Sequence, residues 1–174
     1  MFTTQTPPVR AGRREWLGLA VLMIPVLLIS IDNTVLGFAL PAISTGLHPT
    51  GTQLLWIVDI YALMLAGLLV AMGSIGDRFG RKNMLVVTLL LMGAATALVG
   101  LLPTYAQIGA WAPALLILLR ILQGFSAGGE WGGAALLSVE HAPHGKRGLF
   151  GSAPQIGVPL GMLLATGVLF AVRA

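Results

Sequence analysis

The sequence contains no cysteine and very few charged residues. Charged side chains make up only 9% of its 174 residues, hydrophobic ones make up 56%, and the mean hydropathy is +0.90. A soluble domain normally carries about a quarter charged residues, so this chain cannot cover a water-exposed surface, and it is far too apolar to be disordered. The lack of cysteine excludes disulfides and thiolate metal sites. The class that remains is a membrane protein.

Five apolar stretches divide the chain, and a helix needs about 20 such residues to cross a bilayer. Strands of a membrane barrel would instead alternate in polarity over about 10 residues. The sequence therefore predicts an all-α membrane protein in which residues 1–15 form an N-terminal tail and residues 16–174 form a helical bundle. The predicted spans are residues 16–40, 54–73, 84–102, 111–139 and 149–172.

The basic residues lie almost entirely on one side of these spans. Eight of the ten Lys and Arg residues precede the first span or lie in the loops after the second and fourth, whereas loops 41–53 and 103–110 contain none. By the positive-inside rule the N-terminus is cytoplasmic. Because the positive charge is spread over short loops that set topology, we expect no nucleic-acid partner.

Small residues and prolines within the spans predict how the helices pack and bend. Small residues recur every four positions on the fourth and fifth spans, which lets helix backbones approach closely in lipid. Prolines in the first and fifth spans predict bends or loosened backbone hydrogen bonding. The small residues are Gly124, Gly128, Gly132, Gly157, Gly161 and Ala165, and the prolines are Pro25, Pro154 and Pro159.

Four ionisable residues fall inside the predicted spans, namely Asp32, Asp59, Arg120 and Glu130. A charge at the bilayer centre costs at least about 2.5–3.5 kcal/mol, so each must face a partner or a wet cavity. Asp32 and Arg120 lie at similar depth and could attract each other across the bundle, while Asp59 is close enough to the outer end to reach the interface. Arg120, Gln123 and Glu130 share one helical face. This polar stripe indicates a water-lined pathway, and a purely structural ion-pair network is the alternative.

The segment between the second and third spans predicts a tight cytoplasmic turn. Its glycines permit close approach or unusual dihedral angles. Its aspartate can meet the N-terminal end of an adjoining helix, and its basic residues can pair with acidic groups on neighbouring helices. The residues of this turn are Gly73, Asp77, Arg78, Gly80, Arg81 and Lys82.

This segment closely resembles the loop 2–3 signature of the major facilitator superfamily, G-x-x-x-D-R-x-G-R-[RK], at all six specified positions. Arg120 with Gln123 and Gly124 resembles the superfamily's R-x-x-Q-G signature on its fourth helix. The resemblance implies secondary transport by alternating access, with the aspartate and basic residues of the loop acting as a conformational latch. Members have twelve or fourteen helices in two halves built from repeats, so we expect an N-terminal-half fragment that lacks a sixth helix.

Two parts of the chain resemble different families within that superfamily. Residues 16–82, with Ser30-Ile-Asp32-Asn-Thr34, resemble the 14-helix drug:proton antiporters, in which the helix 1 aspartate is implicated in proton or cation handling. Residues 83–174, with Gly128-Gly-Glu130-Trp-Gly, resemble the metabolite:proton symporters that import small organic anions or zwitterions. One hypothesis is a hybrid chain joined near the shared loop. The alternative is a single subfamily that combines both sets of features.

The resemblance implies a proton-coupled transporter of a small organic cation or carboxylate in the inner (plasma) membrane. Asp32 and Glu130 are the expected proton-titrating carboxylates, Gln123 lies between them on the pathway, and Arg120 is the counter-charge or anion contact. Because the facing wall of the cavity would be missing, transport would require self-association or a complementary transporter half. The alternative is a non-transporting membrane subunit or truncated product whose charges only hold helices together.

No pattern in the sequence indicates an enzyme, a cofactor or a metal ion. His141 and His144 have no acidic or thiol partners at metal-ligand spacing, and we expect no metal site. The glycine pairs on the fourth span are not phosphate loops, because no strand precedes them and no Lys-Ser/Thr follows. With no nucleophile–base set either, the expected partners are the lipid bilayer, protons and a small solute.

Overall fold

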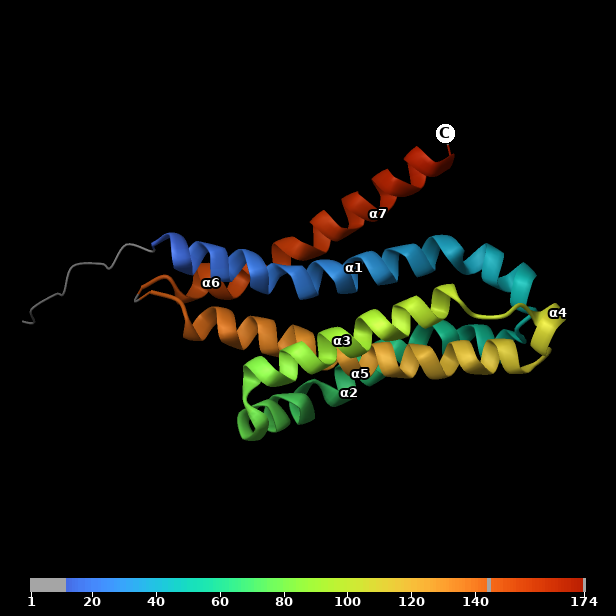
Figure 1. Ribbon diagram of the computed structural model, residues 1–174, viewed down its shortest axis with the longest axis horizontal. Coiled ribbons are helices and arrows are strands. Elements are labelled where there is room, and N and C mark those ends of the chain that lie inside the picture. Colours follow the sequence, from blue (N-terminus) through green and yellow to red (C-terminus); the bar gives the residue numbers. More distant parts are fainter. Residues whose placement is uncertain (1–11, 144, 174) are drawn as a thin grey trace, which may run out of the picture.

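The computed structural model describes residues 12–143 and 145–173 and confirms the all-α prediction (Figure 1). Most of the predicted tail, residues 1–15, lies outside the described residues, and the first helix already begins at Arg13. The helices are α1 (Arg13–Leu47), α2 (Gly51–Phe79), α3 (Arg81–Gly100), α4 (Tyr105–Ile108), α5 (Trp111–Glu140), α6 (Arg147–Ser152) and α7 (Gly157–Arg173), with a 3-10 turn, η1 (Ala153–Ile156), before the last.

Five of the helical segments are long and apolar enough to cross a membrane. Helices α1 and α2 run past the predicted spans at both ends, because hydropathy marks the part of a helix that lies in lipid and not where its backbone hydrogen bonds stop. Thr50 and Gln53 form a capping box that starts α2, with the Thr50 side chain accepting from the Gln53 backbone and the Gln53 side chain accepting from the Thr50 backbone.

The fifth span is interrupted, as its prolines predicted. Pro154 lies in η1, which separates α6 from α7, because a proline removes a backbone donor from the helical ladder. Pro25 and Pro159 are accommodated inside α1 and α7, which continue through them. In Figure 1, α7 leaves the neighbourhood of α1 toward the C-terminal end.

Helix α5 is the centre of the bundle. It packs against α2, α3 and α1, and 61% of its apolar window is buried, compared with 11–28% in the other four spans. Large apolar side chains elsewhere are widely exposed, as expected of surfaces that face lipid. This arrangement puts every polar residue of α5 in reach of α1, α2 or α3.

Candidate functional site

An ion pair joins the two longest helices of the bundle. Arg120 of α5 donates from Nη1 to Oδ2 of Asp32 on α1 over 2.9 Å, and the two side chains are only 3% and 10% exposed. The predicted attraction between these residues is therefore confirmed as a direct contact. A buried pair of this kind is stable only when its remaining donors and lone pairs also find partners.

Hydrogen bonds complete the surroundings of Asp32. Gln123 Nε2 and Thr96 Oγ1 donate to its second oxygen, Oδ1, over 2.8 Å and 3.0 Å. Gln123 also accepts from Arg120 Nη1 at 3.0 Å and lies 2.9 Å from the Thr96 hydroxyl. The Asp32 carboxylate thus accepts three hydrogen bonds from residues of α3 and α5. Gln123 bonds to both members of the ion pair, because it accepts from Arg120 and donates to Asp32.

Arg120 has further contacts that do not involve the carboxylate. Its Nη2 donates to Asn33 Oδ1 at 3.3 Å, and its Nε donates to the backbone carbonyl of Ile57 at 3.3 Å. Its guanidinium carbon lies 4.3 Å from the ring centre of Tyr61 on α2, a cation–π geometry. The guanidinium would therefore keep its position if the charge on Asp32 were cancelled.

Glycines on α5 and α7 make this close approach possible. A Cβ added at Gly124 would lie 2.7 Å from the Tyr61 backbone oxygen, and one at Gly161 would lie 2.6 Å from the Leu27 backbone oxygen. Only glycine fits at these two crossings, which place α2 against α5 and α1 against α7. The predicted small-residue seams are confirmed here, although Gly132 has no comparable contact, since its added Cβ would be 3.8 Å from its nearest neighbour.

Glu130 is buried without a partner. The residue is 0% exposed, and neither of its carboxylate oxygens has a hydrogen-bond partner among the described residues. The Tyr61 hydroxyl and the Ser126 hydroxyl are also buried and unbonded in that part of the chain. Burying a polar group without a hydrogen-bond partner costs free energy. In a native protein such a group indicates that a bound proton, a ligand or a water molecule supplies what is missing.

A cavity of about 410 Å³ opens beside this network, between α1, α2, α5 and α7. Its wall combines the indole of Trp131 with the polar side chains of Ser30, Asn33 and Thr34, and Asn33 also accepts from Arg120. Apolar walls with a few convergent polar groups are typical of small-molecule sites. The remaining lining residues are Val26, Ile29, Leu65, Val158 and Met162.

The loop signature forms a second charged cluster. Arg81, the first residue of α3, donates from Nη2 and Nε to Oδ1 of Asp77 over 2.6 Å and 3.0 Å, and it also pairs with Glu140 at the end of α5. Gly80 adopts φ 87° between α2 and α3, which favours glycine. Three helix ends therefore meet at one guanidinium.

Some predicted site residues occupy other positions than expected. Gly73 lies inside α2 with open space around it, so the prediction that it shapes the turn is wrong; the helix continues six residues further and turns at Gly80 alone. Arg78 and Lys82 are exposed, and no ion pair to either is found among the described residues. Asp59 is exposed on α2, and its place near the interface stays a prediction.

Three members of the network were not predicted. Thr96, Asn33 and Tyr61 contact the ion pair, but each is a common residue type in a membrane helix, and only the rotation of its helix brings it there. Depth gave no signal either, since Thr96 is four residues from the outer end of α3 (Gly100), whereas Arg120 is nine residues from the start of α5 (Trp111). Across residues 12–143 and 145–173, no group of His, Asp or Glu is arranged to hold a metal ion, and His144 lies outside those residues.

Relatives of the chain include both metabolite transporters and a drug efflux pump. The chain is 57% identical over 99 residues to the shikimate transporter of Escherichia coli (57% of this chain, 23% of the relative) and 58% identical over 95 residues to its inner membrane metabolite transport protein YhjE (55% and 22%). It is 54% identical over 104 residues to the multidrug efflux pump LfrA of Mycolicibacterium smegmatis (60% and 19%).

These alignments cover only part of each relative, and the matched segments amount to about a fifth to a quarter of the length of those proteins. All three relatives are transporters and none is an enzyme. The family model described as the Major Facilitator Superfamily matches residues 22–172, which include most of α1, the other four membrane helices, the buried ion pair and the loop cluster. The chain is therefore a multi-pass membrane protein that belongs to the Major Facilitator Superfamily.

Proposed function

We propose that the chain forms part of the solute pathway of a proton-coupled secondary transporter in the inner (plasma) membrane. The observation that carries the proposal is the buried Asp32–Arg120 pair beside the cavity that contains Trp131. Ionisable residues inside a membrane are costly and mark ion, proton or substrate pathways. Membership of a transporter superfamily supports the same function, with alternating access as the mechanism.

Asp32 is proposed as the coupling carboxylate. A proton on its Oδ2 would cancel the charge that now holds Arg120, and so would weaken the main polar connection between α1 and α5. Arg120 would stay in place through Gln123, Asn33 and the Ile57 carbonyl, with its charge free to hold an anionic group of a solute. Protonation would thus be linked both to solute binding and to movement of the two helices.

Glu130 is proposed as a second proton-titrating group. It lies on the same face of α5 as Arg120 and Gln123, and it is buried without a described partner. A carboxyl in such a place is accommodated when a proton neutralises it. The pathway would then have two carboxyl groups that can bind protons, Asp32 on α1 and Glu130 on α5.

The Asp77–Arg81–Glu140 cluster is proposed as the conformational latch. It connects the α2–α3 turn with the last residue of α5. By the distribution of basic residues this end of the bundle faces the cytoplasm. Opening the cytoplasmic side would separate Arg81 from Glu140 while Asp77, four residues earlier in the chain, retains its bond.

The solute is proposed to be a small organic cation or carboxylate, handled together with a second copy of the chain or a complementary transporter half. The relatives support both solute classes, because one carries shikimate and another exports drugs. Alignments to both classes each cover somewhat more than half of the chain. The hybrid hypothesis, in which residues 1–82 and 83–174 have different origins, stays a proposal beside the single subfamily. A single full-length relative that matches both parts equally would contradict it.

Flux into proteoliposomes with an imposed pH gradient tests the transport proposal. Labelled shikimate serves as the carboxylate, a quaternary ammonium dye serves as the cation, and protein-free vesicles give the background. We expect gradient-dependent flux of at least one solute, lost in D32N but retained in D59N, which changes an exposed aspartate outside the network. Background flux of both solutes would favour the non-transporting subunit, and gradient-dependent flux in D32N would remove Asp32 from the mechanism.

A further inference from the structure

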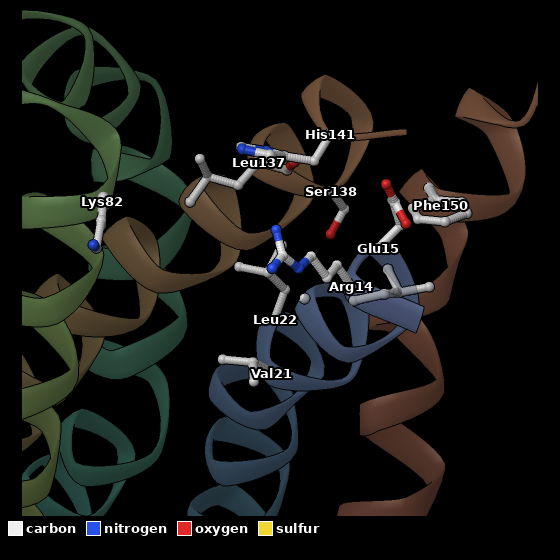
Figure 2. A pocket seen from close by; sticks show the side chains of 11 residues that line it. Arg14, Glu15, Val21, Leu22, Lys82, Leu137, Ser138, His141 and Phe150 are labelled. Atoms are coloured by element: carbon white, nitrogen blue, oxygen red, sulfur yellow. The ribbon is translucent and has the colours of Figure 1, made fainter. Parts of the chain in front are cut away.

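A second cavity, of about 600 Å³, lies at the N-terminal end of α1, whereas Asp32 of the ion-pair network lies near the middle of that helix (Figure 2). It is formed where the first turns of α1 and α3 meet the last turn of α5 and the short helix α6. Of the predicted site residues, Lys82 of the loop signature lines it, and Asp32, Arg120, Gln123 and Glu130 do not. The lining residues are Arg14, Glu15, Gly18, Leu19, Val21, Leu22, Lys82, Leu137, Ser138, His141 and Phe150.

The floor of this cavity is apolar and well packed. Leu19 and Phe150 are 5% and 1% exposed and belong to one buried cluster with Ala153. Leu22 and Leu137 add aliphatic walls. A purely ionic site for a water-soluble anion does not need such a floor, whereas a molecule with an apolar portion gains from it.

An exposed apolar stripe leads away from the cavity along α1. Leu17, Val21, Ile24 and Leu28 are 66%, 61%, 47% and 40% exposed, and their spacing of four, three and four residues puts them on one helical face. From Leu17 to Leu28 the stripe is about 16 Å long at the rise of an α-helix. This length is comparable to one leaflet of the hydrocarbon core, which is about 15 Å thick.

Basic side chains from two helices lie at the mouth of the cavity. Arg14 belongs to α1 and Lys82 to α3, and the imidazole of His141, directly after α5, also lines the cavity. In Figure 2, Arg14 extends between Lys82 on one side and Glu15, beside Phe150, on the other. Within the described part of the chain, neither Arg14 nor Lys82 takes part in an ion pair or a side-chain hydrogen bond.

One detail supports an anion at this place. Arg81, the neighbour of Lys82, is fully engaged by Asp77 and Glu140, so Lys82 is the basic residue of the loop signature that remains for another partner. His141 adds no donor for an anion, because its Nδ1 atom donates to the Leu137 carbonyl oxygen over 2.9 Å and the Nε2 atom of that neutral tautomer is an acceptor. Glu15 is the single acidic residue among those that line the cavity.

We propose that this cavity binds the headgroup phosphate of an anionic phospholipid of the cytoplasmic leaflet, with an acyl chain along the Leu17–Leu28 stripe. Arg14 and Lys82 supply the positive charge, and the floor under Leu19 and Phe150 accepts the glycerol and upper acyl region. Anionic lipids are attracted to basic residues at the cytoplasmic surface. The site is separate from the ion-pair network, because Asp32, Arg120 and Glu130 do not line it, and it adjoins the proposed latch only at Lys82, the neighbour of Arg81.

Lipid retention by the purified full chain tests the proposal. The protein in a neutral detergent is mixed with phosphatidylglycerol or with phosphatidylcholine of the same acyl chains, and bound lipid is counted by native mass spectrometry. We expect at least tenfold tighter binding of phosphatidylglycerol, and at least a fivefold loss in R14Q/K82Q. The matched control R78Q/R147Q removes the same charge from two exposed residues outside the cavity and should bind as the unchanged protein does.

A second variant examines the apolar part of the site. L17S/V21S changes two exposed residues, so it should fold, and we expect it to weaken phosphatidylglycerol binding at least threefold. Equal loss in R14Q/K82Q and R78Q/R147Q would overturn the proposal, because attraction would then depend on total charge. Displacement of the lipid by equimolar glycerol phosphate would also overturn it, since the cavity would then be a site for a free anion.

Discussion

Two buried carboxylates on neighbouring helices differ in their partners. Asp32 of α1 accepts hydrogen bonds from Arg120, Gln123 and Thr96. Glu130 of α5 is completely buried, and no described residue bonds to either of its oxygens. Both were predicted as proton-titrating groups because a charge inside a membrane must face a partner or a wet cavity, and Asp32 also because it resembles the helix 1 aspartate of the drug:proton antiporters.

The difference teaches that burial alone does not define the role of an intramembrane acid. Removing one side of the Asp32 pair leaves the other charge without compensation. No described residue carries a charge that Glu130 compensates. A bound proton is sufficient to neutralise this carboxyl group in its buried position. The mutations below are arranged to separate these two situations by stability, which can be measured without knowledge of the solute.

The largest effect is expected when Arg120 is replaced. R120M leaves Asp32 buried without its counter-ion, which typically costs about 3–5 kcal/mol. We expect the free energy of unfolding, measured by loss of helical circular dichroism in a denaturant titration in detergent, to fall by about this amount. The double variant D32N/R120M carries neither charge and should recover at least half of the loss. No loss in R120M would contradict the ion pair.

The next largest effect is expected at the α2–α5 crossing that supports the network. In G124A the new Cβ would lie 2.7 Å from the Tyr61 carbonyl oxygen, so the helices must separate, whereas in G132A the nearest atom is 3.8 Å away. Overpacking costs about 1–3 kcal/mol, and alanine otherwise favours a helix over glycine. Thermal unfolding in detergent should show G124A below the unchanged protein and G132A at or above it. Equal midpoints would show that α2 and α5 are not held this close.

A smaller effect is expected from the outermost hydrogen bond on Asp32. T96V keeps the shape of the side chain but removes the hydroxyl that donates to Asp32 and lies within hydrogen-bond distance of Gln123. Polar bonds between membrane helices contribute about 0.5–1 kcal/mol, and we expect that loss in the same denaturant titration. The control T45V removes a hydroxyl that bonds only to the carbonyls of Pro41 and Ala42 in its own helix, and it should change stability less.

The sequence was sufficient for the spans and for the similar depth of Asp32 and Arg120, because hydropathy and residue depth depend on position along one helix; the contact between the two residues came from the structure. The sequence was insufficient for Thr96, Asn33 and Tyr61, which reach the pair only through the rotation of their helices about their axes. That rotation depends on the packing of all five spans together.

The turn after the second span shows a different limit. The apolar run ends near Gly73, and the turn was therefore predicted to begin there, but helical hydrogen bonding continues to Phe79. Polar residues end a hydrophobic pattern without ending a helix. The true break is at Gly80, whose φ of 87° is a backbone conformation that favours glycine.

The smallest effect is expected at Glu130. E130Q removes no described hydrogen bond and no ion pair, so it should change the free energy of unfolding by no more than about 0.5 kcal/mol, the range seen for substitutions that disturb no specific interaction. The same acid-to-amide change in D32N removes the counter-ion of Arg120 and should cost several times more. Denaturant titration of the two variants side by side measures the contrast. If E130Q proves as destabilising as D32N, Glu130 holds a partner in the folded protein, and the distinction between a paired and an unpaired carboxylate fails.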